Sequence, residues 1–389
     1  MKNTFVTDTI KYIGVEDADI GLFESQYVVP NGMTYNSYLI MDEKIAVMDT
    51  ADKRRTSEWL AKLDEALDGR EPDYLVVSHM EPDHAANIAN VVERYPSIKV
   101  VGNAKTFTFI NQFFDIDLTD RKVVVKDGDE LSLGSHTLKF IFAPMVHWPE
   151  VMMSYEPSEK ILFAADGFGT FGTIENQEDD WACEARRYYF NIVGKYGAQV
   201  QSVLKKASAL DINIICPLHG PVLNENLGYY IGLYDTWSKY EPEAEGVFVA
   251  HASIHGNTAK AAEKFAEILR AKGAEKVAVA DICRDDIAEC IEDAFKYGKI
   301  VFAAASYDGG VFAPMHDFMQ HLIMKGWRNR KAALIENGTW GPTAARTMKG
   351  MLETMKDITI CENIVTIKSV MKDADIPKLE ALADELLAN

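Results

Sequence analysis

The sequence has few cysteines, and no two of them have the spacing of a known paired motif. Five cysteines occur among 389 residues, and no two form a C-x-x-C pair: Cys183, Cys216, Cys283, Cys290 and Cys361. This odd, scattered set indicates neither a disulfide framework nor a cysteine-bound metal site, and it excludes a rubredoxin-type iron centre within the chain. A reducing, cytoplasmic compartment is therefore the expected location.

The sequence also lacks long apolar runs and an excess of basic residues. No window is apolar over the length that a bilayer requires, and no apolar signal-peptide region follows Met1. The net charge is −19, which would repel nucleic acids and anionic membranes. We therefore expect neither a nucleic acid nor a membrane among the partners of the chain.

The length and composition indicate a globular protein of two domains. A chain of 389 residues is long for one core, and 48% hydrophobic with 25% charged residues is a globular composition. Two styles of sequence meet near residue 245, where Lys239–Gly246 combines charge with proline and glycine and predicts a linker. The predicted domains are residues 1–245 and 246–389.

The first predicted domain is rich in short strand-like runs. They contain many Val, Ile and Phe residues and are bounded by Gly, Asp, Asn and Pro. The runs are Asn36–Ile40, Ile45–Asp49, Tyr74–Ser78, Lys99–Gly102, Lys122–Val125, Leu138–Phe142, Lys160–Ala165 and Ile212–Cys216. Helical patterns occur at Thr56–Leu67, Ala85–Tyr95 and Asn191–Ala209. Such a mixture predicts an α/β sandwich with meandering strands.

The second predicted domain alternates strands and helices regularly. Its apolar strand-like runs are Val247–His251, Lys276–Ala280, Ile300–Ala304, Ala332–Ile335 and Ile358–Cys361. Helical patterns include Ala259–Lys272, which ends at a glycine, and Ile287–Tyr297. Alternation of this kind predicts a doubly wound parallel sheet.

The strongest chemical signal is the run His79-Met80-Glu81-Pro82-Asp83-His84. It holds four potential metal ligands and directly follows a predicted strand, where active-site loops are common. Pro82 predicts a loop rather than a helix. In an extended loop, residues 79, 81 and 83 would share one side and His84 would face the other, which suits two metal ions.

Three more potential ligands stand at the ends of other predicted strands. His147 follows Leu138–Phe142, Asp166 closes Lys160–Ala165, and His219 follows Ile212–Cys216. Each alone is an ordinary polar loop residue, but the complete set of seven is much harder to explain as structural. His136, by contrast, lies in a Gly-Ser-His-Thr turn and is expected to be exposed.

A small polar loop in the second domain predicts a phosphate site. Ser253-Ile254-His255-Gly256-Asn257-Thr258 lies between a strand and a helix, where hydroxyls and backbone N–H groups can hold an anion. The loop has neither the GxGxxG nor the GxxxxGK[ST] pattern, so dinucleotide and nucleoside-triphosphate sites are not indicated. A loop without Lys or Arg suits a monophosphate held by neutral donors.

Two further loops follow parallel strands, where ligands bind in this class of fold. They are Ser306-Tyr307-Asp308-Gly309-Gly310 and Asn337-Gly338-Thr339-Trp340-Gly341. Tyr307 or Trp340 could stack on an isoalloxazine ring, although either could also be a turn aromatic that covers the edge of the core. Three loops in these places favour FMN as the ligand.

The HxExDH motif, followed by a later His, Asp and His, resembles the flavodiiron proteins, also called A-type flavoproteins. This family is a branch of the metallo-β-lactamase superfamily, whose zinc hydrolases carry HxHxDH, with a histidine where this chain has Glu81. The resemblance covers essentially the whole chain. It implies an N-terminal metallo-β-lactamase-like αββα sandwich followed by a C-terminal flavodoxin-like domain.

The resemblance also implies a ligand set for two iron ions. His79, Glu81 and His147 would bind one iron; Asp83, His84 and His219 would bind the other; Asp166 would bridge them. Three carboxylates and four neutral imidazoles would nearly balance two Fe(II) ions and a bridging hydroxide. Ligands of these types suit iron, and they also tolerate zinc or manganese.

By resemblance, the reaction is reduction of O2 to water, of NO to N2O, or of both, with FMN feeding the diiron site. The electron donor would be rubredoxin or a reduced deazaflavin. The working unit would be a head-to-tail homodimer or a pair of such dimers, because in the family the flavin of one subunit faces the irons of the other. The chain departs from many relatives at His255, at Asp308-Gly309-Gly310 and at Glu24-Ser25, which leaves the substrate preference open.

Two other functions fit parts of the pattern. The first is a zinc-dependent metallo-β-lactamase-type hydrolase with an appended flavodoxin domain, and Glu81 argues against it. The second is an electron carrier whose first domain has lost its metal, and the complete set of seven ligand types argues against that.

Overall fold

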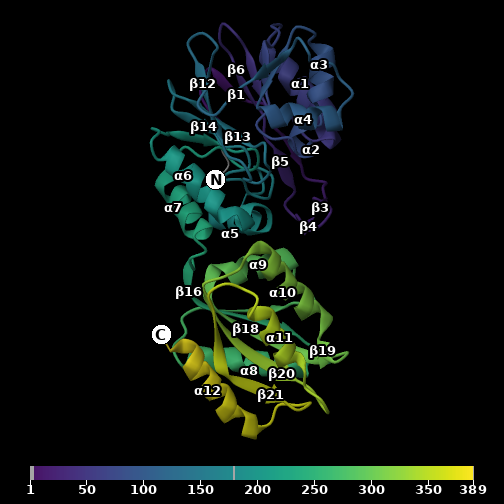
Figure 1. Cartoon of the computed structure of the whole chain (residues 1–389), viewed down its shortest axis with the longest axis vertical. Helices are drawn as coiled ribbons and strands as arrows, with labels where there is room; N and C mark the ends of the chain where they lie inside the picture. The colour runs from purple at the N-terminus through teal and green to yellow at the C-terminus, as the bar shows by residue number, and fades with distance from the viewer. Residues whose placement is uncertain (1–3, 178–179, 389) are drawn as a thin grey trace. The chain divides into compact units, whose positions relative to one another are not determined.

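The computed structural model describes residues 4–177 and 180–388, which form two compact units, Met1–Asp235 and Thr236–Asn389 (Figure 1). The division falls within helix α7 (Leu227–Ser238), whereas the sequence pattern placed it between residues 245 and 246. The last three residues of the expected linker already belong to strand β16 (Ala244–Ala252). Over the described ranges, no helix combines the length and the apolar character needed to cross a bilayer.

The first unit contains two sheets that face each other. One has the order β1-β6-β7-β8-β9-β10, with bounds Ile10–Tyr12, Tyr38–Ile40, Ala46–Met48, Tyr74–Val76, Lys99–Gly102 and Lys122–Val124. The other has the order β11-β12-β13-β14-β15, with bounds Glu130–Ser132, Thr137–Phe142, Met152–Glu156, Ile161–Phe163 and Ile214–Cys216. Buried residues of both sheets, such as Met48, Val76, Phe140 and Phe163, form one shared core.

Helices pack around this sandwich (Figure 1). They are α1 (Thr56–Leu67), α2 (Pro82–Ala85), α3 (Ile88–Arg94), α4 (Ala104–Phe113), α5 (Trp181–Tyr188) and α6 (Gly197–Ala207), with α7. In α1, Trp59, Leu63 and Leu67 recur every four residues and are buried, as expected for one apolar helix face. Figure 1 shows α1, α3 and α4 together at one side of the unit and α6 and α7 at another.

Two small two-stranded sheets also belong to the first unit. Strand β2 (Val15–Asp17) pairs with β5 (Met33–Tyr35), and β3 (Leu22–Phe23) pairs with β4 (Tyr27–Val28). These strands have two or three residues each, which is too short to show a period-two pattern, and the sequence did not predict them. The eight strand-like runs predicted in this unit are all present as strands, most of them shorter than expected.

The second unit has a parallel sheet of order β17-β16-β18-β20-β21. Its elements are β16, α8 (Asn257–Ala271), β17 (Val277–Asp281), α9 (Ile287–Lys296), β18 (Tyr297–Tyr307), β19 (Gly310–Val311), α10 (Ala313–Lys325), β20 (Arg330–Asn337), α11 (Ala344–Leu352), β21 (Ile358–Ile367) and α12 (Ile376–Leu387). The chain order 2-1-3-4-5 is that of flavodoxin-like folds, whose ligands bind where the order reverses, here between β16 and β18.

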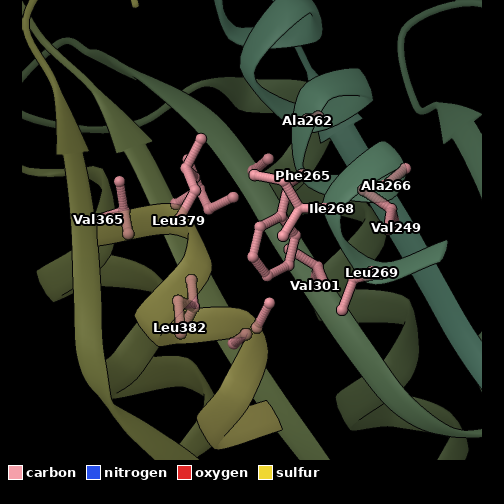
Figure 2. Packing of buried hydrophobic residues seen from close by; sticks show 14 of the residues in the cluster. Val249, Ala262, Phe265, Ala266, Ile268, Leu269, Val301, Val365, Leu379 and Leu382 are labelled. Carbon is pink, nitrogen blue, oxygen red and sulfur yellow. The ribbon is translucent and has the colours of Figure 1, made fainter. Parts of the chain in front are cut away.

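Helices pack on both faces of this sheet. On one face, Val249 and Val301 meet Phe265 of α8 and Leu379 of α12, as Figure 2 shows. On the other face, the Phe302 ring of β18 lies 6.2 Å from a phenylalanine ring of α10. The predicted fold class, a metallo-β-lactamase-like sandwich followed by a doubly wound parallel sheet, is confirmed.

Candidate functional site

The loop after β8 carries the first four candidate ligands, and its shape differs from the prediction. Pro82–Ala85 is a turn of helix, with Pro82 at the first helical position. Proline fits there because the backbone N–H that it lacks would have no partner within the helix. The prediction that Pro82 excludes a helix was therefore wrong. The turn places Asp83 and His84 on a helix, while Glu81 before it is extended.

Four of the seven candidate residues form one group: His79, Glu81, His147 and Asp166. The Nε2 atom of His79 lies 3.2 Å from Oε2 of Glu81 and 3.3 Å from Oδ2 of Asp166. The Nε2 atom of His147 lies 3.0 Å and 3.1 Å from the same two oxygens. Two imidazoles and two carboxylates thus converge on one small volume.

The other three candidates, Asp83, His84 and His219, form a second group. Their Nε2 and Oδ2 atoms lie 3.0 to 3.3 Å apart, with the two imidazole nitrogens 3.0 Å from each other. Two nitrogens that each sit about 2.1 Å from one metal ion, at nearly a right angle, are separated by about 3.0 Å. The spacing of the two histidines is that of two ligands on one ion.

Asp166 reaches both groups through its two carboxylate oxygens. Oδ2 faces His79 and His147, while Oδ1 lies 3.4 Å from Nε2 of His84 and 3.9 Å from Nε2 of His219. The residue is 1% exposed, so this carboxylate is held among the four histidines and away from solvent. Its position suits a ligand shared between two ions.

Buried acceptors fix the orientation of two of the histidines. Nδ1 of His79 lies 2.8 Å from Oε1 of Glu150, and Nδ1 of His219 lies 2.6 Å from the carbonyl oxygen of Thr34. A carbonyl oxygen can only accept, so Nδ1 of His219 carries the proton and its Nε2 lone pair points into the second group. Such acceptors behind a histidine are typical of metal sites. No sequence motif marked Glu150 or Thr34.

The electrostatics of the two groups favour cations. Burial lowers the pKa of His147, but Asp166 and Glu81 outweigh it and raise that pKa to about 9. Burial likewise acts to raise the pKa of Asp166, but the charge of His79 and the nearby imidazoles of His147 and His84 hold it well below its usual range. The Asp166 carboxylate therefore stays ionised and favours positive charge beside it, which metal ions can supply in place of protons.

Three buried carboxylate oxygens without hydrogen bonds in the described part of the chain are further evidence for metal ions. Both carboxylate oxygens of Asp83 and Oδ1 of Asp166 are buried and make no hydrogen bond to any residue that the structure describes. Buried charges without partners are costly, so such atoms normally pair or coordinate a metal. The donor set of carboxylates and imidazoles suits iron, manganese or zinc.

A second candidate site lies at the carboxyl edge of the parallel sheet. A cavity of about 520 Å³ is bounded by the loops after β16, β18, β20 and β21. The cavity wall includes every predicted FMN-binding residue except Gly256: Ser253, Ile254, His255, Asn257, Thr258, Ser306, Tyr307, Asp308, Gly309, Asn337, Gly338, Thr339, Trp340 and Gly341. Thr343 and Ser369 also line it and were not predicted.

The residues of this cavity fit a flat, phosphorylated ligand. Ser253 is 7% exposed, and its hydroxyl has no hydrogen-bond partner within the described ranges. It stands before the N-terminus of α8, where backbone N–H groups favour an anion. Trp340 is 95% exposed and Tyr307 is 50% exposed. Large aromatic side chains left this open at the rim of a cavity can stack on a ligand ring.

Gly256 precedes α8 in a left-handed conformation, with φ of 83°. A β-carbon there would meet no described atom within 4 Å, so glycine serves the backbone conformation rather than close packing. Gly256 thus shapes the loop without lining the cavity.

Comparison with known proteins places the chain among characterised relatives. Residues 33–220 match the family described as ODP family beta lactamase. The chain is 28% identical over 397 aligned residues to a nitric oxide reductase of Moorella thermoacetica, with 98% of each chain covered. It also matches the solved flavodiiron protein of Giardia intestinalis, with a TM-score of 0.92, 23% identity and coverage of 99% of this chain and 96% of that one. The chain therefore has the fold of a flavodiiron protein over nearly its whole length.

The fold of a second solved structure agrees. The rubredoxin oxygen:oxidoreductase of Desulfovibrio gigas superimposes with a TM-score of 0.90 at 24% identity, over 98% of this chain and 97% of that one. The match to the ODP family ends at residue 220, just after His219, so it spans all seven candidate metal ligands of this chain.

His136 is outside both candidate sites, and the expectation of exposure was wrong. The residue is 5% exposed, because its backbone N–H and its Nδ1 lie 2.6 Å and 2.9 Å from Oδ2 of Asp42. A turn sequence does not reveal that a distant carboxylate covers the side chain.

Proposed function

We propose that this chain is a flavodiiron oxidoreductase that reduces O2 to water, NO to N2O, or both, with two iron ions in the first unit and FMN in the second. The observation that carries the proposal is Asp166, whose two oxygens face two converging ligand groups. A pair of ions held this close can bind one diatomic molecule between them. FMN would supply electrons singly or in pairs.

The relatives support this chemistry by their names. One is the nitric oxide reductase of Moorella thermoacetica, and another is an anaerobic nitric oxide reductase flavorubredoxin of Escherichia coli, 24% identical over 90% of this chain and 74% of that one. The Desulfovibrio gigas structure is that of a rubredoxin oxygen:oxidoreductase. Both gases thus occur among the substrates named for similar proteins.

The residues of the chain have separate tasks in this proposal. His79, Glu81 and His147 hold one iron; Asp83, His84 and His219 hold the other; Asp166 bridges. Glu150 and the Thr34 carbonyl keep the protonated nitrogens of His79 and His219 away from the ions. Asp166 and three of its four histidines are buried, and His147 is 10% exposed, so the site has little access to water, which strengthens the electrostatic interactions inside it.

A zinc-dependent hydrolase with an appended flavodoxin domain is not favoured. Glu81 brings a third carboxylate to the site, and the second unit has a cavity with exposed aromatics that a hydrolase does not need. Metal analysis of the purified protein distinguishes the two functions, because the hydrolase would retain zinc and need no flavin.

The metal proposal is tested with Glu81→Ala and Asp166→Ala. Each variant should lose iron and gas-reducing turnover but keep its flavin, because the two sites lie in different units. Glu93→Ala, at an exposed position on α3, is the control and should keep both cofactors. Full turnover of O2 and NO in both site variants, with one defined electron donor, would exclude the proposed centre.

The flavin proposal is tested by cofactor release. The protein should be yellow and should release about one FMN per chain, since a single phosphate loop lies before α8. Recovery of FAD, or of no flavin after reconstitution, would contradict the proposed role of the second unit.

Partners and location complete the proposal. Rubredoxin or a reduced deazaflavin would donate the electrons, two copies of the chain would form a head-to-tail dimer, alone or paired with a second dimer, and the protein would work in the cytoplasm. Steady-state rates with O2 and NO, measured with each donor in turn, separate the substrate and donor alternatives.

A further inference from the structure

The first unit contains an apolar pocket that is separate from the metal ligands. Its volume is about 180 Å³, and Ser208 is the one polar residue in its wall. The other wall residues are Met153, Leu162, Phe168, Val203, Leu204, Ala207, Leu210, Ile212, Ile215 and Ile231. A space this apolar gives water few hydrogen-bond partners, so it favours apolar occupants.

The pocket lies between the second sheet and helices α6 and α7. Leu162 of β14 pairs with Ile215 of β15 and with residue 155 of β13, two positions after Met153, so these side chains share one face of the sheet. Phe163, next to Leu162, belongs instead to the core between the sheets. The pocket is therefore on the outer, helix-covered face.

Burial changes along the pocket. Met153, Leu162 and Phe168 are 2 to 5% exposed, whereas Leu204 and Ala207, near the end of α6, are half-buried and Ser208 is exposed. The pocket is thus a funnel, which opens to the surface at the end of α6 and closes at Phe168.

The closed end lies against the chain segment that follows Asp166. Phe168 is two residues from Asp166, and a β-carbon built on Gly167 would lie 3.2 Å from the methyl carbon of Met153. The backbone N–H of Phe168 donates to the hydroxyl of Tyr234 at 2.6 Å, and the two rings stack at 4.3 Å. These contacts hold the Phe168 ring at the point where the funnel meets the Asp166 loop.

We propose that this funnel binds small apolar diatomic gas molecules and delivers them to the metal site. The inference rests on the proposed function. O2 and NO are weakly hydrated, and apolar cavities of about 150 Å³ stay dry and bind apolar guests such as xenon. A pocket of this kind beside Asp166 raises the local gas concentration where the gas is consumed.

Xenon tests the binding site without turnover. Crystals of the protein with its iron and flavin are pressurised with xenon, and the expected result is a xenon atom among Met153, Leu162 and Phe168. Absence of xenon from this pocket, while the enzyme is active, overturns the inference and leaves the proposed function intact.

Filling the pocket tests delivery. Ala207→Phe places a ring in the mouth of the funnel, and Ala198→Phe, on the same helix but exposed and outside the wall, is the matched control. Ala207→Phe should lose the xenon site and lower kcat/KM for the gas by about three- to tenfold, with iron, flavin and saturated kcat nearly unchanged. The control should match the wild type in every measurement.

Two outcomes would contradict delivery. If Ala207→Phe excludes xenon but keeps the wild-type kcat/KM, the gas reaches the site by another route. If the protein binds xenon but reduces neither gas, the proposed function fails, and delivery fails with it. Leu204→Trp, one turn earlier on α6, repeats the test if Ala207→Phe does not fold.

Discussion

Glu150 shows how one residue outside the motifs can govern a metal ligand. Its Oε1 atom lies 2.8 Å from both Nδ1 of His79 and the backbone nitrogen of Met80, and the residue is fully buried. Glu150→Gln removes the negative charge behind His79, so we expect iron affinity to fall about tenfold or more. Iron titration of the metal-free protein measures the change, and flavin content should stay at the wild-type value.

A matched variant separates this effect from general destabilisation. Glu156 is also fully buried in the first unit, but it lies at the other end of β13 and accepts hydrogen bonds from the backbone nitrogens of Ser158 and Glu159. Glu156→Gln should lower the thermal unfolding temperature without a specific loss of iron affinity. Equal iron affinities in the two variants would show that Glu150 does not act through His79.

The shifted pKa of Asp42 predicts that the folding stability of the protein depends on pH. Desolvation raises its pKa, but hydrogen bonds from His136, Glu43 and Ser135 outweigh it and hold the pKa below its usual range. The ionised carboxylate therefore stabilises the fold fully above the unfolded pKa of about 3.9, and this contribution is lost as the pH falls through the folded pKa.

The variant Asp42→Asn tests this sign. It should have a lower unfolding temperature than the wild type near pH 6, and the difference should shrink as the pH falls below about 4. Losses of iron at low pH are common to both proteins and cancel in the difference. Glu43→Gln, at the exposed neighbouring position, should show no such trend. A difference that stays constant down to pH 2 would exclude the proposed role of the Asp42 carboxylate.

At the scale of elements, the conformation of Gly220 positions the neighbouring candidate ligand His219. It follows His219 with φ of 79°, and its N–H donates to the Thr34 hydroxyl at 2.6 Å. A β-carbon there would lie 2.2 Å from Oγ1 of Thr170. Gly220→Ala should therefore displace His219 and lower iron content, with FMN retained.

The control is Gly69→Ala. Gly69 has φ of 77°, but a β-carbon there meets no described atom within 4 Å, so only backbone strain of about 1 kcal/mol is expected. Iron analysis and thermal unfolding of both variants separate the clash from the strain. If both variants keep full iron, the contact with Thr170 does not position the ligand.

The elements also show how far sequence patterns reach. Strands such as β9 and β12 carry apolar runs and were predicted, whereas β13 (Met152–Glu156) was not, because Met, Ser, Tyr and Glu give it no clear strand composition. Helix α4 was missed too, although Asn103 caps it with two hydrogen bonds from backbone nitrogens. Local patterns identify elements whose composition is typical of a strand or a helix. β13 and α4 lack such a composition and depend on their tertiary surroundings.

The same limit applies to the candidate sites. The seven candidate metal ligands were singled out because polar side chains cluster at strand ends, and the structure brings them together in two neighbouring groups. Glu150 and Thr34 could not be found in this way, since each acts through a contact between segments distant in sequence. The same is true of Ser369 in the cavity proposed for the flavin, since this residue follows the last strand rather than a glycine-rich loop.

At the scale of the whole molecule, the proposed dimer predicts complementation between inactive chains. One variant, His147→Ala, would lack iron, and the other would lack FMN through Asn257→Ala and Thr258→Ala. After subunit exchange, a mixed dimer can place an intact flavin opposite an intact metal site, since a two-fold interface repeats each contact. Part of the activity should therefore return.

The controls for this experiment are the two variants kept apart and a mixture of each with itself. Subunit exchange is followed independently, for example by labels on the two chains, and folding by circular dichroism. If the chains exchange, remain folded and recover no activity, electrons do not pass between subunits and the proposed dimer arrangement is wrong.

The position of Asp166 has a consequence for how the proposed centre is assembled. Since one carboxylate serves both ligand groups, an ion bound in either group changes the charge and the orientation of a ligand of the other. The two binding equilibria are then thermodynamically linked, and the linkage is reciprocal: each ion alters the affinity of its neighbour by the same factor. Iron would thus enter this protein cooperatively or anti-cooperatively, and its uptake would depart from the curve of two independent sites.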